Sequence, residues 1–163
     1  MSLDTFHQIL DIAAPIVAIV GVVIALFQLR NQNRLRQMDV VMRLFSSFGH
    51  ESFLQHFERV MAWKYDSYAA FKKKATDDDN VSLMVVSVFF ENMGLLYKRG
   101  LASLELLDDL LSGPITSAWQ KVKPIWTGRR AEYNQPQWAE WFELLSEDMA
   151  KRLAQLDAKK SRK

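Results

Sequence analysis

Residues 12 to 29, IAAPIVAIVGVVIALFQL, contain no charged side chain, and they constrain this chain more than any other stretch. As a helix this run would be about 27 Å long, close to the ~30 Å hydrocarbon core of a bilayer. A surface helix of a soluble protein has a polar face, whereas every turn from Ile16 to Phe27 is apolar all round. We therefore expect an N-terminal transmembrane helix. The buried helix of a soluble core is the alternative.

A cleaved signal sequence is a second alternative, and it fits less well. Residues 1 to 29 contain no Lys or Arg, and no small-residue cleavage pattern follows the apolar run. Arg30, Arg34 and Arg36 follow the run instead, and basic residues that flank a span stay in the cytoplasm. We expect a single-pass protein with its N-terminus outside and residues 30 to 163 in the cytoplasm. The absence of cysteine fits a reducing compartment.

The rest of the chain has room for one domain of ordinary size. It carries all 21 basic residues and all but two of the 19 acidic residues, a net charge too small to indicate nucleic acid. We divide the chain into a short N-terminus with the transmembrane helix (1–29), a cytosolic helical domain (30–158) and a basic tail (159–163). The tail either contacts anionic lipid or is a solvated end.

Apolar residues recur at steps of three or four after Arg30, and no stretch alternates at period two, so an all-α helical bundle is predicted. Asn80 is the expected cap of the most apolar helix, which should form the centre of the bundle. Gly100 is expected to end that helix in the left-handed conformation. Residues 127–137 are expected to form a loop. The predicted helices are 30–48, 51–64, 81–99, 104–111 (capped by Ser103), 114–123 and one that opens at Pro136.

Two short motifs resemble metal sites but lack the required spacing. In HESFLQH the two histidines, His50 and His56, are six residues apart, so a helix would turn them to different faces. In DDDNVS, Val81 and Ser82 occupy positions where a calcium loop needs a ligand and a glycine. No Gly-rich phosphate loop is present, and no nucleophile can be assigned a base. We expect no metal, no cofactor and no catalytic set.

Glu91 lies inside the helix expected to be most buried, where a carboxylate is unusual unless it is paired. Arg129 and Arg130 are possible partners, and Trp119 is a possible wall of a polar or partner site. A structural ion pair, or a position on the polar edge of the helix, is the alternative. Tryptophans also gather in the last third of the chain, either as core or as part of a docking surface: Trp119, Trp126, Trp138 and Trp141.

Four segments in this order, FFENMGLLYKRG, LLSGPITSAW, KPIWTGRR and WAEWFELL, resemble an uncharacterised family of small bacterial proteins catalogued as a domain of unknown function. The resemblance covers about residues 12 to 150 and implies one N-terminal span in the bacterial inner membrane, a cytosolic helical domain and no known activity. A basic extension after Lys151 departs from the pattern. The matching residues are Phe90, Glu91, Gly94, Gly100, Gly113, Pro114, Trp119, Pro124 and Arg130.

These observations predict a membrane-tethered helical interaction or scaffold module with an unidentified protein partner. The alternative is a membrane-anchored ligand sensor or enzyme with a polar site around Glu91 and Arg130. Small residues at Ala14, Ala18, Gly21 and Ala25 form one stripe on the apolar run, and such stripes permit close helix contact in a membrane. This stripe allows a homo-oligomer formed through the span. The alternative is a span that only anchors the chain in the bilayer.

Overall fold

The computed structural model describes residues 20–30, 32, 39, 42–43 and 45–160. The chain divides after residue 40 into two units, which are described separately. Several predictions fall outside the described residues: the first part of the apolar run with Ala14 and Ala18, most of the first half of the helix expected over 30–48, and the end of the basic tail.

The first unit contributes one short apolar helix, Val20–Arg30. All of its residues are exposed. Its large apolar side chains are between 51% and 67% exposed: Val20, Val22, Val23, Ile24, Leu26, Phe27 and Leu29. The described part of this unit therefore has an apolar surface with no core of its own.

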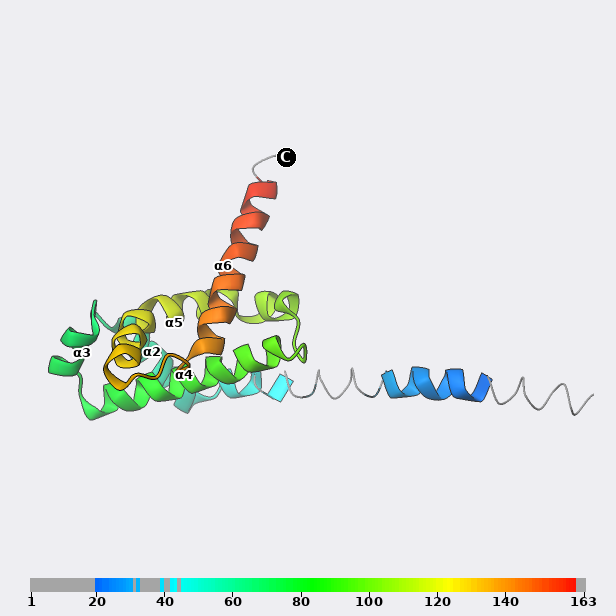
Figure 1. Ribbon diagram of the computed structural model, residues 1–163, viewed down its shortest axis with the longest axis horizontal. Helices are drawn as coiled ribbons and strands as arrows, with labels where there is room; N and C mark the ends of the chain where they lie inside the picture. Colours follow the sequence, from blue (N-terminus) through cyan, green and yellow to red (C-terminus); the bar gives the residue numbers. More distant parts are fainter. Residues whose placement is uncertain (1–19, 31, 33–38, 40–41, 44, 161–163) are drawn as a thin grey trace, which may run out of the picture. The chain divides into compact units, whose positions relative to one another are not determined.

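The second unit is a helical bundle, and the part of the chain that the structure describes contains no strand. This confirms the all-α prediction. Figure 1 shows the bundle with α4 running along its length and α5 and α6 packed over it. Its helices are α2 (Glu51–Ala62), α3 (Tyr68–Lys74), α4 (Asp77–Lys98), α5 (Leu104–Tyr133) and α6 (Glu140–Lys160).

Helix α4 forms the centre of the bundle, as its apolar sequence predicts, because it packs against α2, α5 and α6. Leu83, Val86, Phe90 and Met93 are buried on its inner faces. Among the described helices, α4 alone is long and apolar enough to cross a membrane. Length and composition also suit the core helix of a soluble bundle, and the burial of α4 against its neighbours assigns it to the core.

The start of α4 differs from the prediction, since Thr76 rather than Asn80 is its N-cap. The Thr76 hydroxyl accepts a hydrogen bond from the Asp79 amide (3.2 Å), and the Asp79 carboxylate accepts one from the Thr76 amide (3.0 Å). This reciprocal capping box satisfies two backbone donors and begins the helix four residues earlier than expected. Asp79 also accepts hydrogen bonds from Trp63 and Tyr65, both at 3.0 Å. One carboxylate therefore joins α4 to the connection that follows α2.

Helix α5 is one kinked element where two helices and a loop were expected. The break lies at Leu111 (φ −145°, ψ 21°), three residues before Pro114. A proline ring clashes with the carbonyl four residues earlier, and the non-helical turn relieves that clash. The helix then continues through Pro124 and Gly128 to Tyr133. Gly128 lies inside this helix, and its missing Cβ leaves room for Tyr68 of α3.

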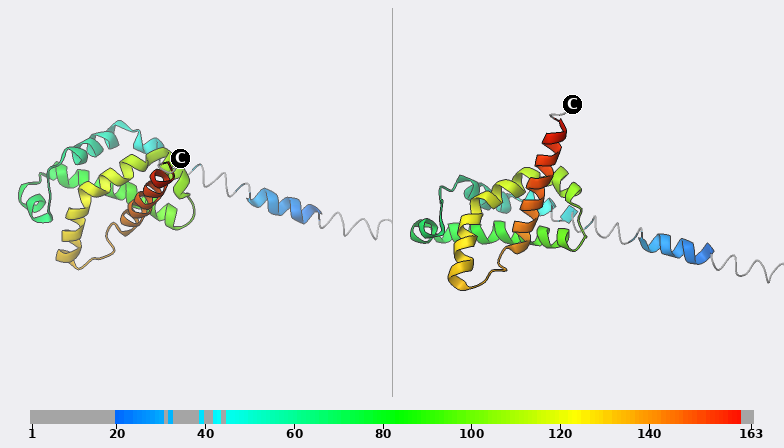
Figure 2. Two further views of the ribbon diagram at one scale, coloured as in Figure 1. Left: turned by 90° about the horizontal axis from the view of Figure 1, so that it is seen from above. Right: turned by 45° about the horizontal axis from the view of Figure 1, so that its top comes forward.

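The connection after α5 is shorter than predicted. Asn134 ends α5 in the left-handed conformation (φ 51°), and α6 begins at Glu140 rather than at Pro136. Helix α6 crosses α4 and α5, and its C-terminal turns extend past the other helices in Figure 1 and in the right view of Figure 2. Gly100 ends α4 with φ +67°, and Ser103 caps α5, both as predicted.

Candidate functional site

Glu91 lies where α4 meets the start of α6. Its Oε2 accepts a hydrogen bond from the Phe142 amide at 2.8 Å, and its Oε1 accepts one from the Trp141 amide at 3.3 Å. The sequence suggested an arginine partner, but the backbone of α6 occupies both carboxylate oxygens. A carboxylate at this place also complements the partial positive charge of a helix N-terminus. The first role of Glu91 in this structure is to cap α6.

Burial raises the pKa of Glu91 above its ordinary value. The Phe142 and Trp141 amides lower the pKa because they stabilise the ionised carboxylate. The negative charge of Glu140 raises the pKa of Glu91 further, and the positive charge of Arg130 lowers it. Desolvation outweighs the two hydrogen bonds, so the carboxyl group holds its proton to higher pH in the folded chain than in the unfolded chain.

Gly94, one turn after Glu91, allows α4 and α6 to approach closely. A Cβ built on Gly94 would overlap the backbone oxygen of Trp141, which no side chain can tolerate. The Glu91 cap and the Gly94 contact therefore fix the same end of α6 against the same face of α4.

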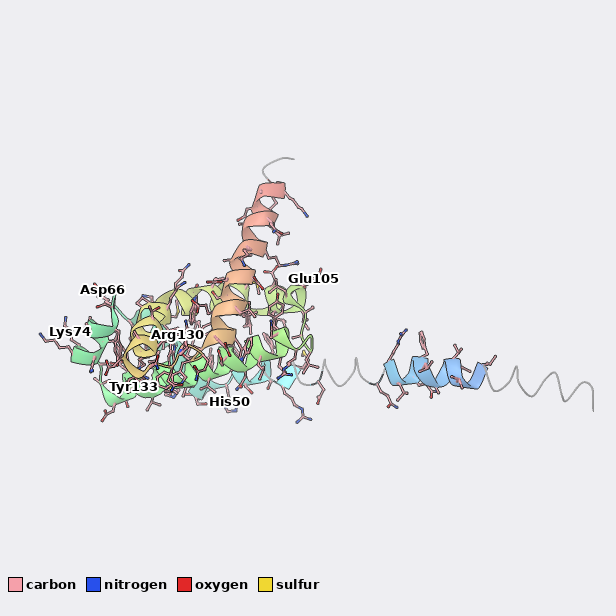
Figure 3. The ribbon with its side chains drawn as sticks, viewed as in Figure 1. His50, Asp66, Lys74, Glu105, Arg130 and Tyr133 are labelled. Carbon is pink, nitrogen blue, oxygen red and sulfur yellow. The ribbon has the colours of Figure 1, made fainter. Side chains whose placement is uncertain are left out.

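Arg130 is tied to the α5–α6 connection and does not form an ion pair with Glu91. Its Nε donates to the Trp138 carbonyl at 2.7 Å, and its Nη1 donates to Glu143 at 2.5 Å. The guanidinium lies over the Trp119 ring, with Cζ 5.9 Å from the ring centroid. Figure 3 labels Arg130 at this junction of α5 with α6. Arg130 and Trp119 thus lie in the packed interior between helices.

Two buried donors at this junction, Trp119 Nε1 and Arg130 Nη2, have no hydrogen-bond partner among the residues that the structure describes. Trp119 is 4% exposed and packs edge-on against Phe142, with ring centroids 4.9 Å apart. The predicted site residues Glu91, Trp119 and Arg130 therefore surround the start of α6, and the packing there leaves two of their donors unsatisfied by the residues described.

Arg129, the fourth predicted residue, lies on a different side of α5 from Arg130. Its Nη2 donates to the Asn80 side-chain oxygen at 2.8 Å, and its Nη1 lies 3.9 Å from the Met84 sulfur. Its Cζ lies 5.7 Å from the Trp126 ring centroid. Arg129 thus bridges α5 to the first turns of α4.

A predominantly apolar pocket of about 350 Å³ opens between α4, α5 and the α5–α6 connection. Both Glu91 and Arg129 line it, and Arg130 does not. Of the two arginines predicted as possible partners of Glu91, the structure brings Arg129 and not Arg130 to the same cavity as Glu91, although the alternative polar site was expected around Glu91 and Arg130. Met84, Val88, Trp126 and Trp138 form most of its apolar wall.

Only part of this pocket can be recognised from sequence patterns. Trp126 and Trp138 were recognised as members of a tryptophan cluster, and their rings meet edge-on at 6.1 Å. Ala139 also lines the pocket with φ 57°, a left-handed conformation that alanine rarely adopts and that no sequence pattern indicates. Helical spacing does place Met84 and Val88 together, but it cannot say that this face of α4 stays open.

No group of three or more His, Asp or Glu residues in the described ranges is placed to hold a metal ion. His50 is exposed. His56 Nδ1 lies 3.0 Å from the Ser82 hydroxyl, which itself donates to the Asp78 carbonyl at 2.8 Å. The Ser82 side chain is buried and its proton is committed to the backbone, so this pair joins α2 to α4 and is not an activated nucleophile.

Comparison with known proteins identifies a family. No curated protein and no solved structure matches the chain. A family model described as a domain of unknown function, DUF4760, matches residues 15–149, which include Val20–Arg30 and α2 to α5 as well as the first half of α6. The family description assigns no activity. The chain therefore belongs to the DUF4760 family.

Proposed function

We propose that this chain is a membrane-tethered helical interaction module. The observation that carries the proposal is the helix Val20–Arg30, whose large apolar side chains are all exposed. The bundle builds a separate core from residues 53–149 and does not include these side chains. An apolar helix that the described residues of its own unit do not bury needs an apolar environment, which a bilayer supplies.

The flanking sequence extends this helix to the length of a span and sets its direction. Residues 12–19 continue the uncharged run toward the N-terminus, and Arg30, Arg34 and Arg36 follow it. Under the positive-inside rule this arrangement puts the bundle in the cytoplasm. For a chain of bacterial origin, which the family resemblance implies, the membrane is the inner membrane.

One open face of α4 supports the interaction role. Val81, Met84 and Val88 recur at steps of three and four, and they are 50%, 44% and 48% exposed. They form an apolar row on an otherwise well-packed bundle, and exposed apolar patches of this kind mark interaction sites. The proposed partner is a protein segment with an apolar face that covers this row.

A ligand sensor or enzyme is the second candidate function, and the pocket between α4 and α5 favours it. The pair that lines this pocket is Glu91 with Arg129. Both Glu91 oxygens are engaged by α6 amides, so the carboxylate is poorly placed to act as a base. Binding without chemistry suits the pocket better than catalysis.

Cysteine labelling tests the tether, because the chain has no cysteine of its own. In intact cells an impermeant thiol reagent should label Ser2→Cys and should not label Lys160→Cys. The reverse labelling would contradict a cytoplasmic bundle. Extraction of the protein from membranes by alkaline carbonate would contradict the span itself.

Site-specific photo-cross-linking tests the interaction role. A photoreactive residue at Met84 should give a discrete adduct that the same residue at Gln55, on the exposed face of α2, does not give. A second change, Val88→Lys, should remove the Met84 adduct while the helical circular dichroism spectrum stays unchanged. Adducts that are identical at both positions, or that survive Val88→Lys, would exclude the α4 row as the docking face.

A further inference from the structure

The pocket between α4, α5 and the α5–α6 connection has an apolar interior and one cation at its rim. Its volume of about 350 Å³ lies within the range of small-molecule sites. Trp126 and Trp138 offer two ring surfaces set almost at right angles, with an interplanar angle of 78°. A cavity of this shape suits a flat apolar group, which can lie against one ring and meet the edge of the other.

Arg129 supplies the cation, and it makes no ion pair within the described part of the chain. Its two hydrogen-bond partners are the neutral amide of Asn80 and the sulfur of Met84. A guanidinium has five donors in a planar fork that matches a carboxylate. A half-buried arginine that is held only by neutral groups keeps its charge available for an anion.

The other charged groups near this arginine are already engaged. Arg130 is paired with Glu143, and Glu132 is paired with Lys72 at 2.7 Å. Glu91 is held by two backbone amides of α6. Arg129 therefore makes no ion pair with the side chains described, and Glu132, whose pKa the Arg129 charge helps to lower, is bonded to Lys72.

The positions of Arg129 and Glu91 determine which end of the pocket can hold the anionic group of a ligand. Arg129 contacts Met84, and Glu91 follows Met84 by seven residues, which is about 10 Å along a helix. An anionic group at the Arg129 end therefore stays away from the Glu91 carboxylate. The apolar part of a ligand then lies along Val88 toward Trp138.

We propose that this pocket binds a small apolar carboxylate, with its carboxylate on the Arg129 guanidinium and its flat apolar part against Trp126 and Trp138. Charge-assisted, bidentate contacts of arginine with carboxylates are the strong ones, and the apolar walls supply the remaining affinity. This binding site goes beyond the proposed tether and interaction role. It shares Met84 and Val88 with the proposed docking row, so a ligand in the pocket and a protein on the row compete for these side chains.

A pair of probes that differ only in charge tests the site. The full chain is reconstituted in nanodiscs of zwitterionic phosphatidylcholine, and equilibrium dialysis measures the binding of 1-naphthylacetate and of its neutral amide, 1-naphthylacetamide. Empty nanodiscs give the background. The acid should bind the wild-type chain about tenfold more tightly than the amide, because only the acid forms a charge-assisted contact.

Four variants connect binding to the pocket. Arg129→Gln should remove the preference for the acid, and Arg129→Lys should retain part of it because the cation remains. Val88→Trp should abolish binding of both probes, since the added ring fills the pocket from an exposed position. Lys73→Gln removes a positive charge from the exposed end of α3 and should change neither affinity.

Three results would overturn the proposal. The first is equal binding of acid and amide to the wild-type chain, and the second is an acid preference that survives Arg129→Gln. The third is the absence of binding by either probe. If Arg129→Gln fails to fold, as shown by circular dichroism, the Arg129→Lys and Val88→Trp results decide the outcome. None of these results bears on whether the chain crosses a membrane.

Discussion

The carboxylate of Glu91 in α4 accepts a hydrogen bond from the backbone amide of Phe142 in α6 at 2.8 Å. A helix leaves its first amides without partners inside the helix, and a side chain just before the helix usually satisfies one of them. The residue before α6 is Ala139, which has no side-chain oxygen. The carboxylate of Glu91, from another helix, therefore replaces a local cap, and the same hydrogen bonds hold α6 against α4.

The stability of the bundle should depend on pH through Glu91. The fragment 41–163 contains the whole core and is expected to fold alone. Because the folded-state pKa of Glu91 is raised, its contribution to stability is fully present below the unfolded pKa of ~4.3 and declines as the pH rises through the folded value. Glu91→Gln removes this pH-dependent contribution. The loss in the free energy of unfolding by urea, relative to the parent fragment, should therefore be larger at pH ~4 than at pH ~7.

The contacts of Glu91 set the expected size of the destabilisation by Glu91→Gln, and an exposed glutamate supplies the control variant. At the lower pH, where the Glu91 carboxyl group is protonated, replacing this acceptor of two part-buried amides should cost about 1–3 kcal/mol. Glu58→Gln, on the exposed face of α2, should stay within about 0.5 kcal/mol of the parent fragment. A cost of Glu91→Gln that grows as the pH rises would contradict the role of burial.

The α4–α6 contact should not tolerate a methyl group at Gly94. The Cβ of Gly94→Ala would overlap the Trp141 carbonyl, so the two helices must separate, at a cost of about 1–3 kcal/mol. Gly113→Ala is the matched control, because a Cβ at this helical position meets nothing within 4 Å. It should raise stability by about 0.5–1 kcal/mol, and thermal unfolding of both variants measures the contrast. Destabilisation by both changes to the same extent would refute the packing explanation.

Self-association through the apolar helix is a separate prediction. Gly21 and Ala25 are exposed on one face of Val20–Arg30, four residues apart, and small residues allow two helices to approach closely in a membrane. Replacing both with isoleucine should abolish association in a membrane two-hybrid reporter while insertion persists. The paired change Val22→Ile and Val23→Ile, elsewhere on the helix, should leave it intact. Association that survives the first pair would assign any oligomer to the bundle.

The basic tail should bind anionic lipid weakly. Lys151 is paired with Asp148 and Arg152 with Asp108, so the cations that remain for lipid begin at Lys159. Each Lys or Arg near an anionic surface gains about 1 kcal/mol. Fragment 41–163 should sediment with vesicles that contain phosphatidylserine and not with phosphatidylcholine vesicles, and a fragment that ends at Ala158 should not sediment with either. Sedimentation of the shorter fragment would discard the tail as the lipid contact.

Sequence patterns predict the elements of the bundle better than their ends. The position of Gly100 indicates a left-handed stop, and glycine adopts this conformation without strain. Thr76 and Asp79 have the spacing of a capping box, but the same run of acidic residues also resembles a calcium loop, and Asn80 resembles a cap. Pro114 was interpreted as a helix start, whereas a single non-helical residue, Leu111, absorbs its effect within one long helix.

The candidate site was less predictable, because it depends on which side of a helix each residue faces. Arg129 and Arg130 are neighbours in sequence and turn about 100° apart on an α-helix. One lies over Trp126 and the other over Trp119. The sequence identified both arginines and Glu91 but could not assign the pocket to Arg129, because helix α5 was expected to end before either residue.

The C-terminal end of α6 projects from the bundle, and this separates the charges of Lys159 and Lys160 from those of the bundle. Arg152, bonded to Asp108 at 2.8 Å, is the last residue with an ion pair to the bundle among those described. Lys159 follows it by seven residues, about 10 Å along the helix, which exceeds the ~8 Å Debye length at physiological ionic strength. Counterions therefore screen Lys159 and Lys160 from the carboxylates of the bundle, and Asp157 is the one acidic residue close to them in sequence. The end of α6 thus presents the positive charges of Lys159 and Lys160 more than one Debye length from the ion pair of Arg152. Added salt should therefore weaken the attraction of these two lysines to an anionic surface without a change in the folding of the bundle.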